Sequence, residues 1–188
     1  MILGLTGPMA SGKSTVVNAL KNIGYQHITL SQFVREEAEQ QGVEQERENL
    51  MAVGQDLREK GGAGVLGQRA LDRVNQDGGG KWIVDGIRNP AEVEALRQHP
   101  DFILIANTAT EDQIISRIFS RKRSDDTLDE AAIRHKLRRE MGEGEPPEGQ
   151  QVAKCIEMAD YEFENVMAFE EVGPEFMKLY DEIARSKD

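Results

Sequence analysis

The stretch Gly4–Thr15, GLTGPMASGKST, decides the fold of this chain. Gly7, Gly12, Lys13 and Ser14 match the pattern G-x-x-x-x-G-K-[ST], and the pattern stands between a predicted strand and a predicted helix, as its mechanism requires. Glycines let successive backbone N–H groups turn toward phosphate oxygens, and the positive end of the following helix adds to their field. The stretch therefore predicts a P-loop, a phosphate-binding loop at the start of an α/β domain.

The side chains of this loop have expected roles in nucleotide binding. Lys13 should reach the terminal phosphates, and the hydroxyl of Ser14 should ligate Mg²⁺. The residues expected to bind ATP are Gly7, Ala10, Ser11, Gly12, Lys13, Ser14 and Thr15. ATP and Mg²⁺ are therefore the predicted cofactors.

Short apolar runs alternate with helical patterns along the rest of the chain. The strand candidates are MILGLT, HITL, WIVD, FILIAN and YEFENV. This alternation favours a parallel sheet covered by helices on both faces, with ligands bound at the carboxyl ends of the strands. A length of 188 residues suits one domain, so we expect a single domain over residues 1–188.

Several predicted helices carry start signals. The segment NPAE offers Asn89 as N-cap, Pro90 at the first helical position and Glu92 at the third. The segments TEDQ (Thr110–Gln113) and TLDE (Thr127–Glu130) have the spacing of capping boxes. These signals predict helices that begin close to residues 90, 111 and 128.

The charge distribution speaks against a nucleic-acid-binding protein. The net charge is -11, and from Glu140 onward there are 14 acidic and 4 basic residues, against 20 acidic and 19 basic before it. A broad basic surface is therefore missing, whereas short basic clusters such as RIFSRKR (117–123) suit a small anion. Small-molecule nucleotides are the expected partners, with no nucleic acid.

No apolar run approaches the roughly 20 residues that a membrane span needs, and no membrane contact is expected. The opening MILGLTG lacks the basic region of a signal peptide, so we expect a soluble, cytoplasmic protein, a monomer or homodimer. The single cysteine, Cys155, cannot form an internal disulfide and is expected to pack in the core. The scatter of the three histidines argues against a Cys/His zinc site.

Three observations choose among the classes of protein that share a P-loop. An N-K-x-D guanine motif is absent from the sequence, which counts against a GTPase. Asp85 in WIVDGIR is followed by Gly86 and not by the glutamate that polarises an attacking water, which counts against a hydrolysing motor. Arg117 and Arg121, four residues apart, share one helix face, and with Arg123 they could clamp a transferring phosphoryl group. A kinase is the favoured class.

The chain resembles the P-loop nucleoside monophosphate kinases, among them adenylate-kinase-related and dephospho-CoA-kinase-like proteins. It is especially similar to the kinase-like domain fused to some deoxycytidylate deaminases, in LSQFVREEAEQQG, VDGIRNPAEVEALR and GQQVAKCIEMADYEFEN. The zinc signature of the deaminase itself, H-x-E with P-C-x-x-C, is absent. The resemblance implies a P-loop NTPase fold, a three-layer α/β sandwich with a five-stranded parallel sheet, an acceptor-binding helical segment over about residues 31–75 and a short lid over about residues 117–140.

The same resemblance implies roles for residues outside the P-loop. Arg35, in a helix that Ser31 is expected to cap, matches an arginine that holds the acceptor's phosphate, although it could instead pair with Glu39. Arg88 matches a second acceptor-phosphate arginine, so the residues expected to bind the acceptor are Ser31, Arg35 and Arg88. Asp85 would orient Mg²⁺ through its water shell, unless it serves as an N-cap or a buried ion-pair partner. The catalytic set is therefore Lys13, Asp85, Arg88, Arg121 and Arg123.

The lid arginines follow from the resemblance as well. Arg117 is expected to bind ATP, while Arg121 and Arg123 are expected to touch phosphate; the alternative is a solvated basic face. The segment IRHKLRRE (133–140) is expected to be a solvated helix face without a site.

The acceptor group can be argued from the residues after the second strand. Dephospho-CoA kinases place an aspartate there to take the proton of a hydroxyl, whereas HITLSQFVRE has Ser31. A phosphate acceptor is already deprotonated and needs only cations, which Arg35 and Arg88 supply. We therefore expect ATP-dependent phosphoryl transfer to a (deoxy)nucleoside monophosphate. A dephospho-CoA kinase-like enzyme, with Glu36 or Glu37 as base, and a non-catalytic nucleotide-sensing module remain the alternatives.

Overall fold

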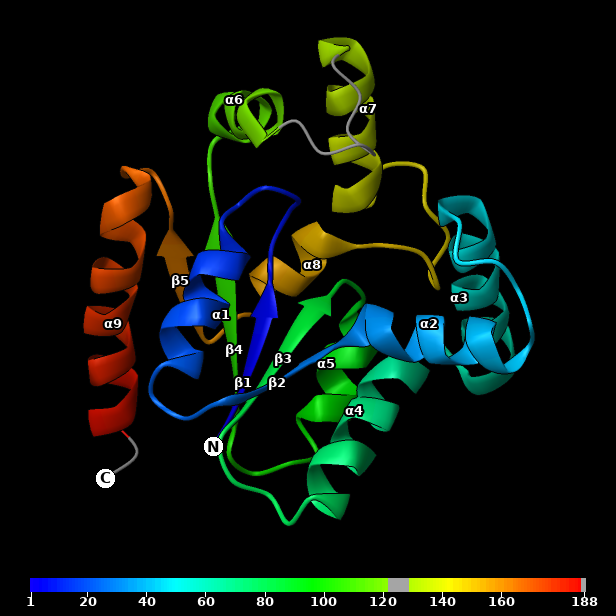
Figure 1. Cartoon of the computed structure of the whole chain (residues 1–188), viewed down its shortest axis with the longest axis horizontal. Helices are drawn as coiled ribbons and strands as arrows, with labels where there is room; N and C mark the ends of the chain where they lie inside the picture. The colour runs from blue at the N-terminus through cyan, green and yellow to red at the C-terminus, as the bar shows by residue number, and fades with distance from the viewer. Residues whose placement is uncertain (122–128, 187–188) are drawn as a thin grey trace.

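The computed structural model of the protein describes residues 1–121 and 129–186 (Figure 1). Its sheet contains five parallel strands in the order β2-β3-β1-β4-β5. The strands are β1 (Ile2–Thr6), β2 (Gln26–Thr29), β3 (Trp82–Ile87), β4 (Phe102–Thr108) and β5 (Tyr161–Glu164). All five predicted strands are confirmed, and so is the predicted five-stranded parallel α/β sheet.

Helices connect the strands and cover the sheet. They are α1 (Lys13–Lys21), α2 (Leu30–Gln40), α3 (Arg47–Gly61), α4 (Val65–Gln76), α5 (Pro90–Leu96), α6 (Glu111–Arg121), α7 (Glu130–Met141), α8 (Val152–Glu157) and α9 (Phe169–Arg185). Within the described residues, no helix combines the length and apolar character that crossing a membrane requires.

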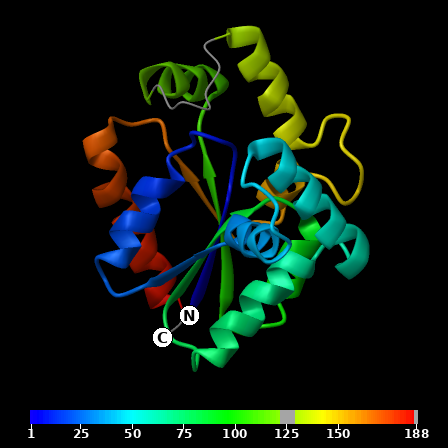
Figure 2. The same ribbon diagram turned by 45° about the vertical axis from the view of Figure 1, so that its right-hand side comes forward.

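Two apolar cores lie on opposite faces of the sheet. Successive residues of a strand point to opposite faces, so Ile2 of β1 joins one core while Leu3 joins the other. The Leu3 core packs against α1 and α9, and the Ile2 core packs against α2 to α5 and α8. Figures 1 and 2 show these two groups of helices on opposite sides of the sheet. Cys155 of α8 is fully buried in the Ile2 core, so its predicted packing role is confirmed.

The carboxyl ends of the strands form the edge that positions the site. The P-loop follows β1, the Asp85–Arg88 stretch lies at the end of β3, and Asn107 lies near the end of β4. Helices α6 and α7 stand beyond this edge, across the ends of the strands (Figure 1). In a parallel sheet this edge is where ligands bind.

Two of the predicted helix starts are confirmed. Asn89 Oδ1 accepts a hydrogen bond from Ala91 N at 2.9 Å, and Glu92 Oε2 accepts one from Asn89 N at 3.1 Å. In the second capping box, Gln113 Oε1 accepts from Thr110 N at 3.1 Å and Thr110 Oγ1 accepts from Gln113 N at 3.3 Å.

The other two expected caps are wrong. Asp129 caps α7 by accepting from Ala131 N, whereas Thr127 lies outside the described residues. The N-cap of α2 is Thr29, because Leu30 is buried and already helical, which draws the helix start back to the end of β2. Ser31 is therefore an exposed residue of the first turn and does not cap the helix.

Candidate active site

The P-loop has a backbone that its glycines make possible. Gly7 has a φ of 131° and Gly12 a φ of 100°, both in the region that favours glycine. A Cβ added to Gly12 would lie 2.0 Å from Asn165 Nδ2, and one added to Gly7 would lie 2.1 Å from Asn107 O. Ala10 has a φ of 55°, a strained conformation that costs about 1–3 kcal/mol. Such strain persists only where the surroundings hold the backbone, and it is frequent at ligand sites.

Two buried amides hold this loop in place. Asn107 Nδ2 and Asn165 Nδ2 both donate to Ser11 O, at 2.6 and 2.8 Å. Arg117 donates to Asn165 Oδ1 at 3.0 Å and lies 3.4 Å from the carbonyls of Ala10 and Ser11. Arg117 thus contacts the P-loop backbone directly, and burial lowers its pKa below the usual range. The two asparagines thus fix the Ser11 carbonyl, and with it the backbone of the loop.

Asn107 and Asn165 did not come from the sequence reasoning. Their signal was present, because FILIAN and YEFEN are two apolar strand patterns that each end on an asparagine. A buried amide at the carboxyl edge of the sheet is a polar group that needs partners, and here the P-loop supplies them.

Lys13 lies folded over the P-loop. Its Nζ donates to Gly7 O at 2.6 Å and to Pro8 O at 2.7 Å. Burial lowers the pKa of Lys13 from 10.5 to about 8, while Asp85 and Glu140 act in the opposite direction. The ammonium is therefore still mostly protonated at neutral pH, and two carboxylates lie close enough to influence it.

Asp85 is the last residue of β3 in regular register with β1, just before a bulge, and it lies close enough to Lys13 to interact with its charge. The pairing of β1 with β3 shifts between Leu5 and Thr6, and the extra residue, Gly86, has a φ of 82°. Asp85 Oδ1 accepts from Gly86 N at 2.7 Å. Burial alone would raise the pKa of Asp85, but His27, Lys13 and the Gly86 N–H together hold it below 3.8. Asp85 is therefore a carboxylate anion at neutral pH.

His27 is a third residue that the sequence analysis missed. It stands on β2, the strand next to β3, and its Nε2 lies 3.8 Å from Asp85 Oδ2. This Nε2 is buried and has no hydrogen-bond partner among the described residues. The only signal for this role in the sequence is a histidine inside a predicted strand.

The oxygen donors around the loop fit Mg²⁺. Ser14 is exposed in the first turn of α1, and its hydroxyl makes no hydrogen bond to any described residue. Asp85 supplies a carboxylate from the neighbouring strand. No cluster of three or more His, Cys, Asp or Glu side chains suited to a metal occurs in the described part of the chain. Mg²⁺ keeps several water ligands and binds through few protein oxygens plus substrate phosphates, so Ser14 and Asp85 would suffice.

Arg88 lies just past β3, between two side chains from distant parts of the chain. Its Nη1 is 3.2 Å from Gln150 Oε1, to which it donates, and 3.5 Å from Glu140 Oε1. The other oxygen of Glu140 accepts a hydrogen bond from the P-loop amide Met9 N at 2.8 Å. One charged cluster therefore contains Lys13, Asp85, Arg88 and Glu140. The charges of the other three residues all affect the pKa of Lys13, which also indicates that the four lie close together.

The expectation of a solvated face over residues 133–140 is wrong. Ile133, Leu137 and Glu140 are buried, and their spacing of four and three residues places them on one face of α7. Glu140 continues an apolar stripe that packs against α6 and reaches the P-loop. A glutamate at the third position of such a stripe was the signal available in the sequence.

Glu92 fixes the backbone that carries Arg88. Its Oε2 accepts from Arg88 N at 2.9 Å and from Asn89 N at 3.1 Å, and its Oε1 lies 3.3 Å from Arg58 Nη2 of α3. Burial raises the pKa of Glu92, and Arg58 and the two N–H groups oppose that rise. One buried carboxylate thus ties the helical segment after β2 to the residue expected to hold the acceptor.

The structure separates Arg35 from its neighbouring carboxylates. Arg35 is exposed on α2 and forms no ion pair with any described residue, so the alternative pairing with Glu39 is not made. Glu36 pairs with Arg73 at 3.6 Å and Glu37 with Arg69 at 3.0 Å, both on α4. Hydrogen bonds from Gln41 and Arg69 lower the pKa of Glu37, which makes it a weaker base.

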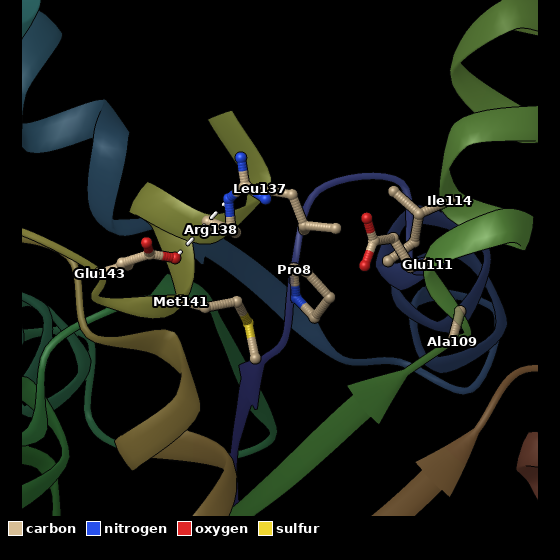
Figure 3. Close-up of a pocket in the computed structure, with 8 residues that line it drawn as sticks. All are labelled: Pro8, Ala109, Glu111, Ile114, Leu137, Arg138, Met141 and Glu143. Atoms are coloured by element: carbon tan, nitrogen blue, oxygen red, sulfur yellow. Dashed lines mark ion pairs between the residues drawn. The ribbon is translucent and has the colours of Figure 1, made fainter. Parts of the chain in front are cut away.

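Two expected lid arginines cannot be placed. Arg123 lies outside the described residues, and so does the side chain of Arg121 at the end of α6. Among the described residues, a cleft of about 390 Å³ opens between α6 and α7 beside Pro8 of the P-loop, as Figure 3 shows. Its lining residues are Pro8, Ala109, Glu111, Ile114, Leu137, Arg138, Met141 and Glu143.

Known proteins resemble this chain over most of its length. The family model described as "AAA domain" matches residues 6–134, which include the P-loop, Asp85, Arg88 and Arg117. A UPF0200 protein of Methanosarcina mazei is 31% identical over 90% of this chain and 88% of its own length. The chain belongs to the UPF0200 family. Another UPF0200 protein, from Methanothrix thermoacetophila, is 32% identical over 98% of this chain and 99% of its own length.

A longer relative also matches. A UPF0200/UPF0201 protein of Archaeoglobus fulgidus is 31% identical over 98% of this chain, but the chain spans only 56% of that relative's length. The names of these UPF0200 relatives state no reaction.

Solved structures show the same fold at low sequence identity. The shikimate kinase of Aquifex aeolicus superposes with a TM-score of 0.55 at 17% identity, covering 98% of both chains. The shikimate kinase of Bacteroides thetaiotaomicron gives a TM-score of 0.58 at 13% identity, covering 96% of this chain and 98% of its own. The UPF0200 chain therefore has a P-loop kinase-like fold, the fold of nucleotide-binding phosphotransferases.

Proposed function

We propose that this protein transfers the γ-phosphoryl group of ATP to the phosphate of a nucleoside or deoxynucleoside monophosphate. The observation that carries the proposal is the meeting of Lys13, Asp85 and Arg88 beside the P-loop, at the carboxyl edge of the sheet. A loop for the donor's phosphates and a separate arginine for the acceptor's phosphate are the parts that phosphoryl transfer between two nucleotides needs.

The donor side rests on the P-loop. Its N–H groups and the start of α1 would hold the phosphates of ATP, and Lys13 would follow the charge on the transferred group. Bound Mg²⁺, held by Ser14 and oriented through water by Asp85, would neutralise phosphate charge. Arg117, which contacts the backbone of the loop, would complete the ATP site together with Gly7, Ala10, Ser11, Gly12 and Thr15.

The acceptor side rests on two arginines. Arg88 stands on a backbone fixed by the buried Glu92 and is about half exposed, so its guanidinium can still take a phosphate. Arg35 is exposed with no described ion-pair partner, on the first of the three helices between β2 and β3. We assign these helices to acceptor binding, and α6 with α7 to a lid, with Arg121 and Arg123 at its phosphate side.

A hydroxyl acceptor, as in a dephospho-CoA kinase-like enzyme, is the second candidate. The observation in its favour is Glu140, a buried carboxylate beside Arg88 that could take the proton of a hydroxyl. Glu36 and Glu37 are poorer candidates for that task, because both are engaged with arginines of α4.

A panel of acceptors tests the proposal. The protein is incubated with Mg-ATP and each nucleoside monophosphate, each deoxynucleoside monophosphate, the matching nucleosides and dephospho-CoA. The proposal expects ADP together with a nucleoside diphosphate, and almost no product from nucleosides that lack the 5′-phosphate. Phosphorylated dephospho-CoA would establish the second candidate instead. Nucleotide binding without ADP formation across the panel would favour a sensing module and refute the enzyme.

A further inference from the structure

Glu140 occupies a position where a phosphate-binding protein would not be expected to place a negative charge. Its Oε2 accepts the N–H of Met9, an amide inside the P-loop, at 2.8 Å. Its Oε1 lies 3.5 Å from Nη1 of Arg88. The side chain is only 6% exposed, so the carboxylate is held at this place and is not a surface group that happens to lie nearby.

The two groups that Glu140 contacts are both anion ligands. P-loop amides and arginines donate hydrogen bonds to phosphate oxygens, and a carboxylate side chain can accept hydrogen bonds from the same donors. With Glu140 in place, the charges of Lys13 and Arg88 are matched by those of Asp85 and Glu140. Once Glu140 leaves, the cations exceed the carboxylate that remains, and the site favours an anion.

We propose that Glu140 is a built-in occupant of the anion site, which a phosphate group of the bound nucleotide displaces from Met9 and Arg88. The inference rests on the proposed function only in that the P-loop binds nucleotide phosphate. It adds a competition between the lid helix and the ligand, which sets nucleotide affinity and links the filling of the site to the position of α7.

The proposed displacement needs space beside α7. The described residues leave the cleft of about 390 Å³ between α7 and α6, and Leu137 and Met141 of α7 line it beside Pro8 (Figure 3). Glu140 stands one residue before the end of the helix, ahead of Gly142, whose φ of 116° ends it. A shift of this helix end toward the cleft would withdraw the carboxylate and bring the apolar side of α7 against Pro8.

Calorimetry with a non-hydrolysable ATP analogue tests the competition. Wild-type protein and Glu140→Gln are titrated with Mg²⁺-adenylyl imidodiphosphate at equal pH and ionic strength. Loss of a charge-assisted bond and of one repelling charge should tighten binding by about 5- to 20-fold in the variant. The matched control is Glu175→Gln on α9, outside the cleft. It also removes one charge, from an exposed ion pair with Lys178, and should leave the affinity within about 2-fold.

The outcomes separate this inference from the proposed function. If the wild type binds the analogue and the folded Glu140→Gln variant binds it equally well or more weakly, the inference is overturned and the proposed function stands. No binding by either protein would overturn both. If Glu140→Gln does not fold, the NMR resonance of the Met9 amide in the wild type tests the displacement. Binding of the analogue should shift this resonance, because a phosphate oxygen replaces Glu140 as the hydrogen-bond acceptor. An unchanged resonance at saturating analogue would refute the displacement.

Discussion

Replacing Arg58 with methionine tests how the site is held together. Arg58 of α3 is the cationic partner of Glu92, whose side chain is 1% exposed and whose other oxygen holds the N–H groups of Arg88 and Asn89. Methionine keeps much of the volume of the side chain and removes the charge. Removing one partner of a buried ion pair costs about 3–5 kcal/mol. Because Arg58 is 19% exposed and Glu92 keeps two backbone hydrogen bonds, we expect a smaller loss than this, about 2–3 kcal/mol of unfolding free energy.

This loss should depend on pH in a direction that the pKa of Glu92 fixes. Burial already raises that pKa above 4.5, and without Arg58 it rises further. An acid with a raised folded-state pKa binds its proton more tightly when the protein is folded. The stability that protonation of Glu92 contributes is therefore fully present below pH 4.5 and is lost as the pH rises through the raised pKa of the folded protein. The difference between wild type and Arg58→Met should shrink as the pH is lowered from neutral toward 4.5.

Urea unfolding followed by circular dichroism measures both effects. The matched control is Lys60→Met on the same helix, which removes a charge from an exposed ion pair with Asp56 and should leave the unfolding midpoint unchanged. The reasoning is refuted if Arg58→Met is as stable as Lys60→Met at neutral pH, or if its deficit grows on acidification.

Three further predictions concern the reaction. Lys13→Ala should abolish turnover while the far-ultraviolet circular dichroism spectrum stays unchanged. In the wild type, the affinity for ATP should fall as the pH rises through about 8, because Lys13 loses its charge there. Titration calorimetry should show no such pH dependence in the variant. Activity should require Mg²⁺, and Asp85→Asn should lower kcat more than it weakens ATP binding; turnover in EDTA would contradict this. Arg88→Ala and Arg35→Ala should each lower kcat/KM for the acceptor by about 10- to 150-fold in steady-state kinetics, with little change in ATP binding. Arg88→Lys should restore little activity, because an ammonium group lacks the two parallel donors of a guanidinium. If both variants lose affinity for ATP instead, the two arginines belong to the donor side.

The fold could be predicted because its signals are local. The P-loop pattern, the five apolar runs and the caps at Asn89 and Thr110 each depend on neighbours within a few residues, and the structure confirms them. The start of α2 was wrong because burial of Leu30, a tertiary effect, outweighs the capping preference of Ser31.

The site was only partly predictable because several of its residues act across the chain. Asn107, Asn165 and Glu140 meet the P-loop from 96 to 154 positions away in sequence, and His27 meets Asp85 across two strands. Asparagine and glutamate are common on solvated surfaces, so their type alone carries no signal. Only their places, at the ends of apolar strands or within an apolar helix stripe, set them apart.

The most direct test of the central claim follows the label of γ-labelled ATP. The protein is mixed with Mg-ATP and the best monophosphate acceptor from the panel, and the products are separated during a single turnover. Transfer from the P-loop site to a monophosphate held by Arg88 predicts that the label appears in the β-phosphate of a new nucleoside diphosphate, in amounts equal to the ADP formed. Label recovered as inorganic phosphate, or left in ATP while the acceptor is saturating, would contradict the account.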